Sequence, residues 1–301
     1  MNILVLGNSF DAHALHMRDA LTKAGTAVNY LDTRLFPTQV QISWQPDIQA
    51  GCLVLPGGHQ LNLQDIKSVF WRNFSAPYIP NLPEGQQTIA FSDAMSVLRT
   101  LLQAKPVRWV NSWQAYQFHK EKPLQLSQVK LLGVEIPATL ISNNPHQVIE
   151  FCKIQPKTIF KPVYGGTHTQ FVSDFHLEPH RLNLVLRLSP VTFQEYIPGT
   201  NIRSYVIGED IYAAEIRSNS LDFREDEKAQ LIPVELPDLV QQQCLAISRA
   251  LMLEWTAIDW RLKPTGEYVF LEANPSPMFL HFEQQTKFPI TQSLVNLLLV
   301  N

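Results

Sequence analysis

The chain has 301 residues, long enough for two or three packed sub-domains. Apolar residues make up 45% of it, which excludes a predominantly disordered protein. Its 24 Lys and Arg against 27 Asp and Glu give a net charge of −3, which argues against a general nucleic-acid binder. Three widely separated cysteines without metal-ligand spacing predict no disulfide framework and favour a reduced, cytoplasmic setting.

The first residues lack the basic segment and the long apolar run of a signal peptide. The apolar run near residue 300 is too short to span a bilayer. We therefore expect neither export nor membrane insertion.

The first 111 residues predict an α/β domain, because an apolar strand, a helix and a second strand follow one another. A hairpin is expected around Pro56-Gly57-Gly58-His59. There is no GxGxxG loop, which argues against a dinucleotide site. The expected strands lie at 3–6, 28–31, 52–55, 61–63, 69–72 and 108–110, and the expected helices at 12–23 and 88–103.

The pattern changes near residue 112, and a further change follows Pro198-Gly199. These changes predict a central domain at 112–197 and a C-terminal domain at 198–301. In the central domain we expect helix at 116–132, broken only at Pro123, and strands at 158–161, 170–172 and 192–196. In the C-terminal domain we expect strands at 203–207, 211–216, 257–262 and 268–271 and helices at 239–251 and 289–300.

Asp259, Glu272 and Asn274 are the sharpest candidates for a metal site. The hairpin length places Asp259 near Glu272, and Asn274 is two residues further along the same strand face. Two carboxylates and one amide oxygen suit Mg²⁺ or Mn²⁺ and not zinc. Ordinary surface ion pairs on a hairpin are the alternative. The apolar sequence around both carboxylates favours the metal site, since a buried carboxylate needs a partner.

Lys161, followed by Gly165 and Gly166, is a candidate phosphate site. An ammonium group at a strand end and the N–H groups of a glycine loop can together hold phosphates, although the order is not that of a Walker motif. A plain hairpin turn with a surface lysine is the alternative. Lys122 is a second candidate cation, or else part of a solvated charge run.

The segment Gln194-Glu195-Tyr196-Ile197 ends a strand at the predicted domain junction. Such a strand end can offer backbone N–H and C=O groups to an adenine edge; a simple strand end is the alternative.

Together these motifs resemble the ATP-grasp superfamily over nearly the whole chain. Asn111-Ser112, Lys122 and the segment 131–139 are similar to the start of its central domain, and Lys161 with Gly165-Gly166 to its phosphate loop. Residues 194–197 are similar to its adenine hinge, and Asp259, Glu272 and Asn274 to its metal triad. The resemblance implies an α/β (α+β) ATP-grasp fold with an N-terminal pre-ATP-grasp α/β domain at 1–111, and ATP with Mg²⁺ or Mn²⁺ as cofactors.

Within the superfamily the chain resembles the graspetide ligases, which cyclise microviridin-type precursor peptides. The residues that carry this likeness lie at 32–37, 70–72, 216–218, 222–224 and 259–275. The chain departs from that pattern at Trp71-Arg72-Asn73, at Asn201 in place of an acidic residue, and at Ser276-Pro277-Met278 in place of Gly-Gln. The first and last departures lie near the expected position of the acceptor.

The resemblance implies ligation through an acyl phosphate, with ω-ester or ω-amide bonds formed between side chains of a ribosomal precursor peptide. Arg203 and Arg217, on paired antiparallel strands, are expected to stabilise the transferring phosphoryl group and the tetrahedral oxyanion, and Asn201 is expected to bind the nucleotide. Asp222 and Arg224 are expected to contact the leader peptide.

Two other functions remain open. The chain could join a free amino acid to a protein or small peptide, as ribosomal-protein glutamate ligases do, or bind nucleotide without turnover. The two carboxylates and Asn274 argue against the second. The partners expected are a precursor peptide or another carboxylate substrate, without nucleic acid or membrane, and the sequence leaves a homodimer open.

Overall fold

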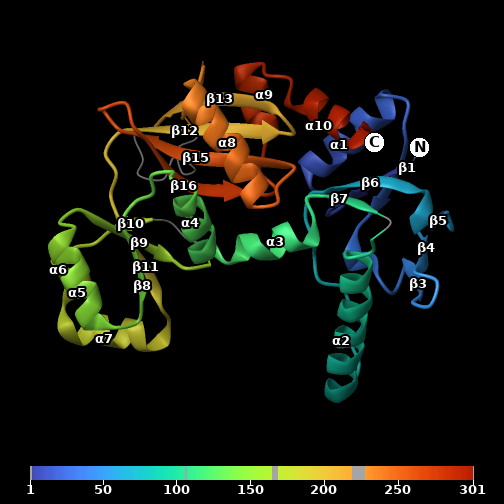
Figure 1. The fold of residues 1–301 in the computed structure, drawn as a ribbon. Coiled ribbons are helices and arrows are strands. Elements are labelled where there is room, and N and C mark those ends of the chain that lie inside the picture. Colours follow the sequence, from blue (N-terminus) through green and yellow to red (C-terminus); the bar gives the residue numbers. More distant parts are fainter. Residues whose placement is uncertain (1, 106, 165–168, 219–227, 301) are drawn as a thin grey trace. The chain divides into compact units, whose positions relative to one another are not determined.

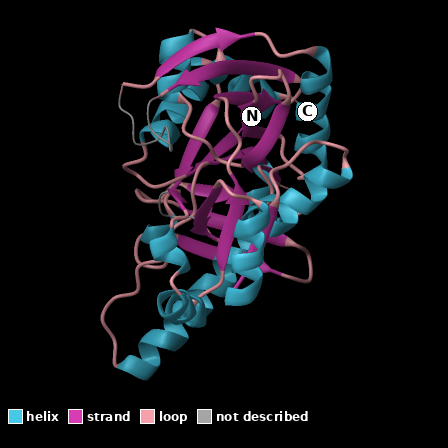
Figure 2. Cartoon of the chain, turned by 90° about the vertical axis from the view of Figure 1, so that its left-hand side faces the viewer, coloured by secondary structure: helices cyan, strands magenta, loops and turns pink. Residues whose placement is uncertain are grey.

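The computed structural model describes residues 2–105, 107–164, 169–218 and 228–300. The chain forms two compact units: one comprises Met1–Tyr116, Met252–Trp255 and Pro275–Asn301, the other Gln117–Leu251 and Thr256–Asn274. Helices and strands are both frequent in each (Figures 1 and 2), so the expected mixed α/β class is confirmed. The expected domain boundaries at 111 and 197 stay a prediction. Among the described residues no helix is long and apolar enough to cross a membrane.

A parallel sheet with the strand order β2-β1-β6-β7 lies at the centre of the first unit. Its strands are β1 (Asn2–Leu6), β2 (Ala27–Leu31), β6 (Ile66–Trp71) and β7 (Arg108–Val110). Residues 3–6 are fully buried, as expected for a strand covered on both faces.

Among the described residues, the α-helices that lie wholly in this unit are α1 (Ala12–Lys23), α2 (Glu84–Leu101), α9 (Leu280–Thr286) and α10 (Ile290–Leu299). α1 begins where the Asp11 carboxylate accepts the Ala14 N–H. It ends before Gly25, which adopts a φ of 79°, a conformation that glycine reaches easily because it has no Cβ. Lys67 and Ser68 of β6 donate to the last carbonyl groups of α10, which ties the C-terminal helix to the sheet.

An antiparallel sheet of β3 (Gln41–Gln45), β4 (Ala50–Val54) and β5 (Gln60–Asn62) completes the first unit. The predicted hairpin is confirmed, with Cys52 opposite Asn62 and with positive φ at Gly57 and Gly58 in its turn. β3 was not expected, and it extends this hairpin to three strands.

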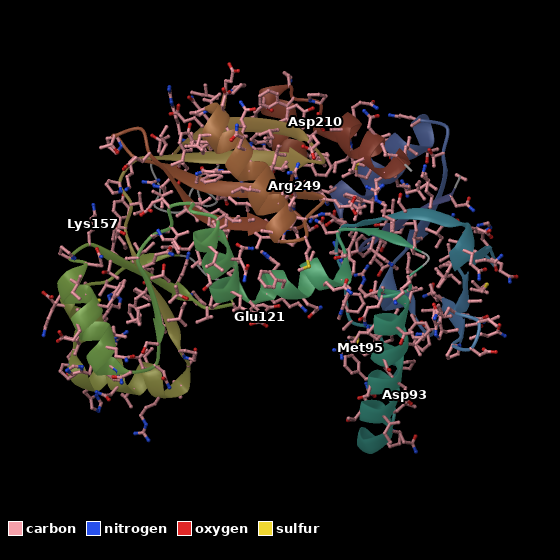
Figure 3. The ribbon with its side chains drawn as sticks, in the orientation of Figure 1. Asp93, Met95, Glu121, Lys157, Asp210 and Arg249 are labelled. Atoms are coloured by element: carbon pink, nitrogen blue, oxygen red, sulfur yellow. The ribbon has the colours of Figure 1, made fainter. Side chains whose placement is uncertain are left out.

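The second unit begins within α3 (Trp113–Lys120), which α4 (Lys122–Leu131) follows directly. Glu121, labelled in Figure 3, separates the two helices. Pro123 lies in the first turn of α4, where its missing N–H costs nothing, so it starts this helix instead of breaking a longer one.

The first sheet of this unit has the order β10-β9-β11-β8 and is antiparallel. Its strands are β8 (Thr139–Ser142), β9 (Thr158–Pro162), β10 (Gln170–Phe171) and β11 (Val191–Glu195). Figure 1 shows α5 (Pro145–Ile154), α6 (Asp174–Leu177) and α7 (Pro179–Leu188) beside it, and Phe193 packs against Val148 and Leu186 of these helices. Because side chains alternate along a strand, Lys161, Thr192 and Ile141 share the opposite face.

The second sheet has the order β14-β13-β12-β15-β16. Its strands are β12 (Thr200–Ile207), β13 (Asp210–Arg217), β14 (Gln230–Val234), β15 (Trp255–Leu262) and β16 (Tyr268–Asn274). α8 (Asp238–Ala250) packs on β12, where the Cys244 thiol lies 3.5 Å from the Ser204 hydroxyl. Among the described strands, β16 lies at the edge of this sheet.

Candidate functional site

The β15–β16 hairpin brings the two candidate carboxylates together. Asp259 and Glu272 are directly opposite in the register, and Asn274 lies two residues further on the same face. Trp260 pairs with Phe270, so Leu271 is an extra residue that forms a β-bulge next to Glu272. Bulges of this kind redirect side chains, and here the bulge sets where the Glu272 carboxylate points.

Arg203 of β12 contacts the first of these carboxylates. Its Nε and Nη2 donate to the two Asp259 oxygens at 2.7 and 2.8 Å, a bidentate pair whose side chains are only 17% and 11% exposed. Burial disfavours the guanidinium charge, but the adjacent Asp259 outweighs that effect and raises the pKa of Arg203. Arg203 therefore stays a cation beside Asp259.

Lys122 contacts the second carboxylate. Its Nζ donates to Glu272 Oε2 at 2.8 Å, and the two side chains are 28% and 24% exposed. Burial and the Lys122 charge lower the pKa of the neighbouring His119. Two cations and two carboxylates thus face one another, and their formal charges sum to zero.

Lys161 and Gln194 lie on the face of the first sheet that carries Thr192. Lys161 Nζ donates to Gln194 Oε1 at 3.1 Å, and Gln194 Nε2 donates to Thr139 Oγ1 at 2.9 Å. A small cavity of about 20 Å³ joins these elements; its lining includes Lys122, Lys161, Thr192, Leu271 and Glu272. The structure thus brings both candidate phosphate-binding lysines and one candidate metal ligand to a single cavity.

The predicted adenine hinge, residues 194–197, begins in the last two residues of β11 and runs beyond its end. The N–H groups of Glu195 and Tyr196 donate to the carbonyl oxygens of Ala138 and Lys157, so an adenine would use other groups of this segment. The Lys157 ammonium, labelled in Figure 3, lies 4.2 Å from the centre of the Tyr196 ring.

Arg261 ties this segment to the second sheet. Its Nε donates to Ile197 O, and its Nη1 donates to Asn201 Oδ1 at 2.8 Å. Burial lowers the pKa of Arg261. The Asn201 side chain is therefore engaged in holding the chain between the two sheets.

Arg217 is the described candidate that does not join this cluster. Arg217 pairs with Glu215 at 2.8 Å, is 60% exposed, and lies an odd number of residues from Ala214, the partner of Arg203. Strand alternation thus directs Arg217 to the face opposite Arg203. Gly165, Gly166, Asp222 and Arg224 lie outside the described residues.

Asp259, Glu272 and Asn274 fit a magnesium ion by their chemistry, because all three supply hard oxygen donors. In the described part of the chain, no group of three or more His, Cys, Asp or Glu side chains is suited to hold a metal. Two carboxylates and one carboxamide are therefore a sparse set, of the kind that leaves several positions of Mg²⁺ to water and phosphate.

A second polar cluster lies in the first unit, where β1 and β6 end. Arg72 Nη1 donates to the Ser276 backbone and hydroxyl oxygens at 2.6 and 2.7 Å, and its Nε lies 3.3 Å from Asp11. Two positions that depart from the graspetide pattern therefore contact each other. Burial and the Arg72 charge lower the pKa of His13 to about 4, and His13 Nδ1 accepts the Phe279 N–H.

Sequence reasoning missed Gln125 and His119. Gln125 is 2% exposed and hydrogen-bonded to Ala273 on β16. Its spacing from Lys122 puts both residues on one face of a helix, which was the available signal.

The chain is similar to one protein-family model and to several proteins of known structure. Residues 2–117 match the family model of the MvdD pre-ATP grasp domain. The ATP-grasp ligase PsnB, solved with a phosphomimetic variant of its minimal precursor, Mg and ADP, is 26% identical at a TM-score of 0.86, over 98% of this chain and 97% of that chain. The macrocyclase MdnC from Microcystis aeruginosa MRC, bound with precursor peptide MdnA, is 26% identical at a TM-score of 0.87, over 100% of both chains.

A RimK domain protein from Sphaerobacter thermophilus DSM 20745 shares the fold, at 13% identity, a TM-score of 0.66 and 100% coverage of both chains. No curated protein sequence matches the chain. These findings confirm the resemblance to ATP-grasp ligases and the expected fold.

Proposed function

We propose that this ATP-grasp ligase forms ω-ester or ω-amide bonds between side chains of a ribosomal precursor peptide, using ATP and Mg²⁺. One observation carries the proposal: Lys122, Lys161 and Glu272 line a single cavity, and Asp259 lies directly opposite Glu272. Cations and oxygen ligands in one place are what phosphoryl transfer to a carboxylate requires.

The chemistry begins with a side-chain carboxylate of the peptide. One of its oxygens attacks the γ-phosphorus of ATP, and the bond from that phosphorus to the β-γ bridging oxygen breaks. ADP is released, and the carboxylate has become an acyl phosphate. A hydroxyl or amino group then attacks the acyl carbon, phosphate leaves, and the nucleophile loses its proton. The sum is one ester or amide bond, ADP and phosphate for each ATP.

The residues divide this work by charge. Lys122 and Lys161 bind phosphate oxygens of the nucleotide, with the glycine loop at Gly165 as a further phosphate contact. Arg203, held as a cation by its bidentate pair, faces the transferring group and its developing charge. Asp259, Glu272 and Asn274 would hold the magnesium ion, which would supply positive charge to neutralise the nucleotide phosphates.

The peptide substrate is supported by the relatives. PsnB and MdnC were solved with precursor peptides, and their likeness covers nearly the whole chain. In this protein we assign leader binding to Asp222 and Arg224, and we place the reaction in the cytoplasm, where its three free cysteines stay reduced. Analytical ultracentrifugation of the purified protein tests whether the enzyme is a homodimer.

Mass spectrometry tests the function. The enzyme is incubated with a candidate precursor peptide, ATP and Mg²⁺, and we expect the peptide to lose one water for each bond formed. A gain of one amino-acid residue would instead support addition of a free amino acid. Nucleotide binding without ADP formation, over a panel of such peptides and amino acids, would identify a non-catalytic module.

A further inference from the structure

Gln125 closes the open edge of β16. This strand is the last in its sheet, so no neighbouring strand from the described residues pairs with its outer N–H and C=O groups. At Ala273 a side chain replaces that strand: the Ala273 N–H donates to Gln125 Oε1 at 2.9 Å, and Gln125 Nε2 donates to Ala273 O at 3.0 Å. One carboxamide thus makes the same pair of hydrogen bonds that a facing residue would make.

We call these two hydrogen bonds between Gln125 and the Ala273 backbone the clamp. The clamped residue, Ala273, lies between two of the candidate metal ligands. Ala273 is fully buried and pairs with Ile258, while its neighbours Glu272 and Asn274 point to the opposite face. Any rotation or shift of the Ala273 backbone therefore moves both neighbouring side chains. β16 also has the Leu271 bulge just before Glu272, where pairing with β15 is locally disrupted.

The clamp also connects the two sides of the cavity. Gln125 is three residues after Lys122 on α4, so one helix face holds both the Glu272 side chain and the Ala273 backbone. Gln125 is only 2% exposed, so breaking its hydrogen bonds to Ala273 would leave buried polar groups without water, at a high cost in free energy. The Glu135 carbonyl, which accepts the Phe270 N–H, fixes the same edge before the bulge.

We propose that Gln125 is a positioning residue that sets the orientation of Glu272 and Asn274 for a divalent cation. The inference rests on the proposed function, since it assumes that these two residues hold Mg²⁺. Groups that orient metal ligands without touching the metal are commonly worth about 10–100-fold in metal affinity or activity. Losing the clamp therefore weakens metal binding more than nucleotide binding or folding.

The test replaces Gln125 by Met, which keeps the length of the side chain and removes both hydrogen bonds. Gln241→Met is the matched control, because Gln241 on α8 also donates to a backbone carbonyl, that of Leu236. Mn²⁺ binding is measured by electron paramagnetic resonance with a non-hydrolysable ATP analogue present. Nucleotide binding without divalent cation and the melting temperature are measured in parallel.

We expect Gln125→Met to weaken Mn²⁺ binding about 10–100-fold. Nucleotide binding without metal should stay within about threefold of wild type, and the control should leave Mn²⁺ binding unchanged. Wild-type Mn²⁺ affinity in Gln125→Met would overturn the inference, as would equal weakening of Mn²⁺ and metal-free nucleotide binding. If Gln125→Met does not fold, Gln125→Asn, whose amide is one methylene short, is held to the same criteria.

The readouts separate this inference from the function itself. A wild-type enzyme that binds Mn²⁺ with the nucleotide but modifies no peptide contradicts the proposed function and leaves the clamp testable. A wild-type enzyme that ligates peptide while Gln125→Met keeps its full Mn²⁺ affinity contradicts only the clamp.

Discussion

The ion pair between Lys122 and Glu272 implies an exchange of partners when nucleotide and metal bind. The Lys122 ammonium lies 2.8 Å from Glu272 Oε2. In the proposed reaction the same lysine binds phosphate, and the same carboxylate binds Mg²⁺. Lys122→Met removes the cation while keeping the length of the side chain, so it separates these two roles.

The size of the effect follows from the geometry. Two unit charges about 4 Å apart attract by about 4 kcal/mol at an effective dielectric constant of 20. Both side chains are about a quarter exposed, so solvent screening and desolvation reduce the net value to about 1–2 kcal/mol. Since about 1.4 kcal/mol corresponds to a tenfold change, Lys122→Met should bind Mn²⁺ without nucleotide about tenfold more tightly than wild type.

Nucleotide binding should change in the opposite direction. Loss of a hydrogen bond to a charged phosphate costs about 1.5–3 kcal/mol, so metal-free ATP affinity should fall about 10–100-fold. Isothermal titration calorimetry measures both constants. Lys130→Met is the matched control, because Lys130 lies on the same helix and pairs at 3.2 Å with the exposed Glu135. A Lys122→Met variant with wild-type affinity for both ligands would refute the exchange.

Three further predictions concern the site, the first unit and the substrate. Glu272→Gln should reduce the rate of ADP formation at least about 100-fold and cost about 1–2 kcal/mol of stability, the net value of its ion pair with Lys122. Asp259→Asn should reduce the rate likewise and cost about 3–5 kcal/mol of stability, because it removes the countercharge of a buried guanidinium group. Normal turnover in either variant would move the metal site elsewhere. His13 is neutral in the folded protein down to about pH 4 but titrates near 6.5 when unfolded, so stability should fall as the pH drops from 7 to 5, by about 1 kcal/mol after allowance for partial exposure. Urea unfolding of wild type and His13→Gln at both pH values checks this, and an equal pH dependence in the two proteins would contradict it. Asp222→Ala and Arg224→Ala should weaken binding of a fluorescent precursor peptide by a few kcal/mol at most and leave ATP affinity unchanged, and unchanged peptide affinity would place leader binding elsewhere.

Local signals in the sequence explain which elements could be predicted. The helix at Ala12–Lys23 has a capping aspartate before it and a glycine after it, and the structure has these limits. β14 was missed because Pro233 interrupts its apolar run, and a proline in a strand is tolerated at an edge, which is where β14 lies. α5 was also missed, although Asn144 and Pro145 give it a clear N-terminal signal.

In the candidate site, too, local contacts could be predicted from the sequence and long-range contacts could not. The juxtaposition of Asp259 and Glu272 follows from hairpin pairing, which is local, and the register confirms it. The ion pairs with Arg203 and Lys122 join residues 56 and 150 positions apart, and no periodicity in the sequence encodes such contacts. The sheet face that Arg217 occupies could not be predicted for another reason. Knowing that two strands pair does not show which face each arginine occupies unless the register is also known.

The distribution of charge explains how the two carboxylates of the cluster are stabilised. A buried carboxylate costs several kcal/mol unless it is paired, so Asp259 needs a countercharge, and the partly buried Glu272 gains from one. Arg203 and Lys122 supply them, one from the same sheet and one from α4. The two are not equivalent: Arg203 is held by two hydrogen bonds and less exposed than Lys122, which is held by one. Lys122 should therefore be the partner that leaves first, so that entry of the nucleotide phosphates frees Glu272 for Mg²⁺ while Arg203 keeps Asp259 in place.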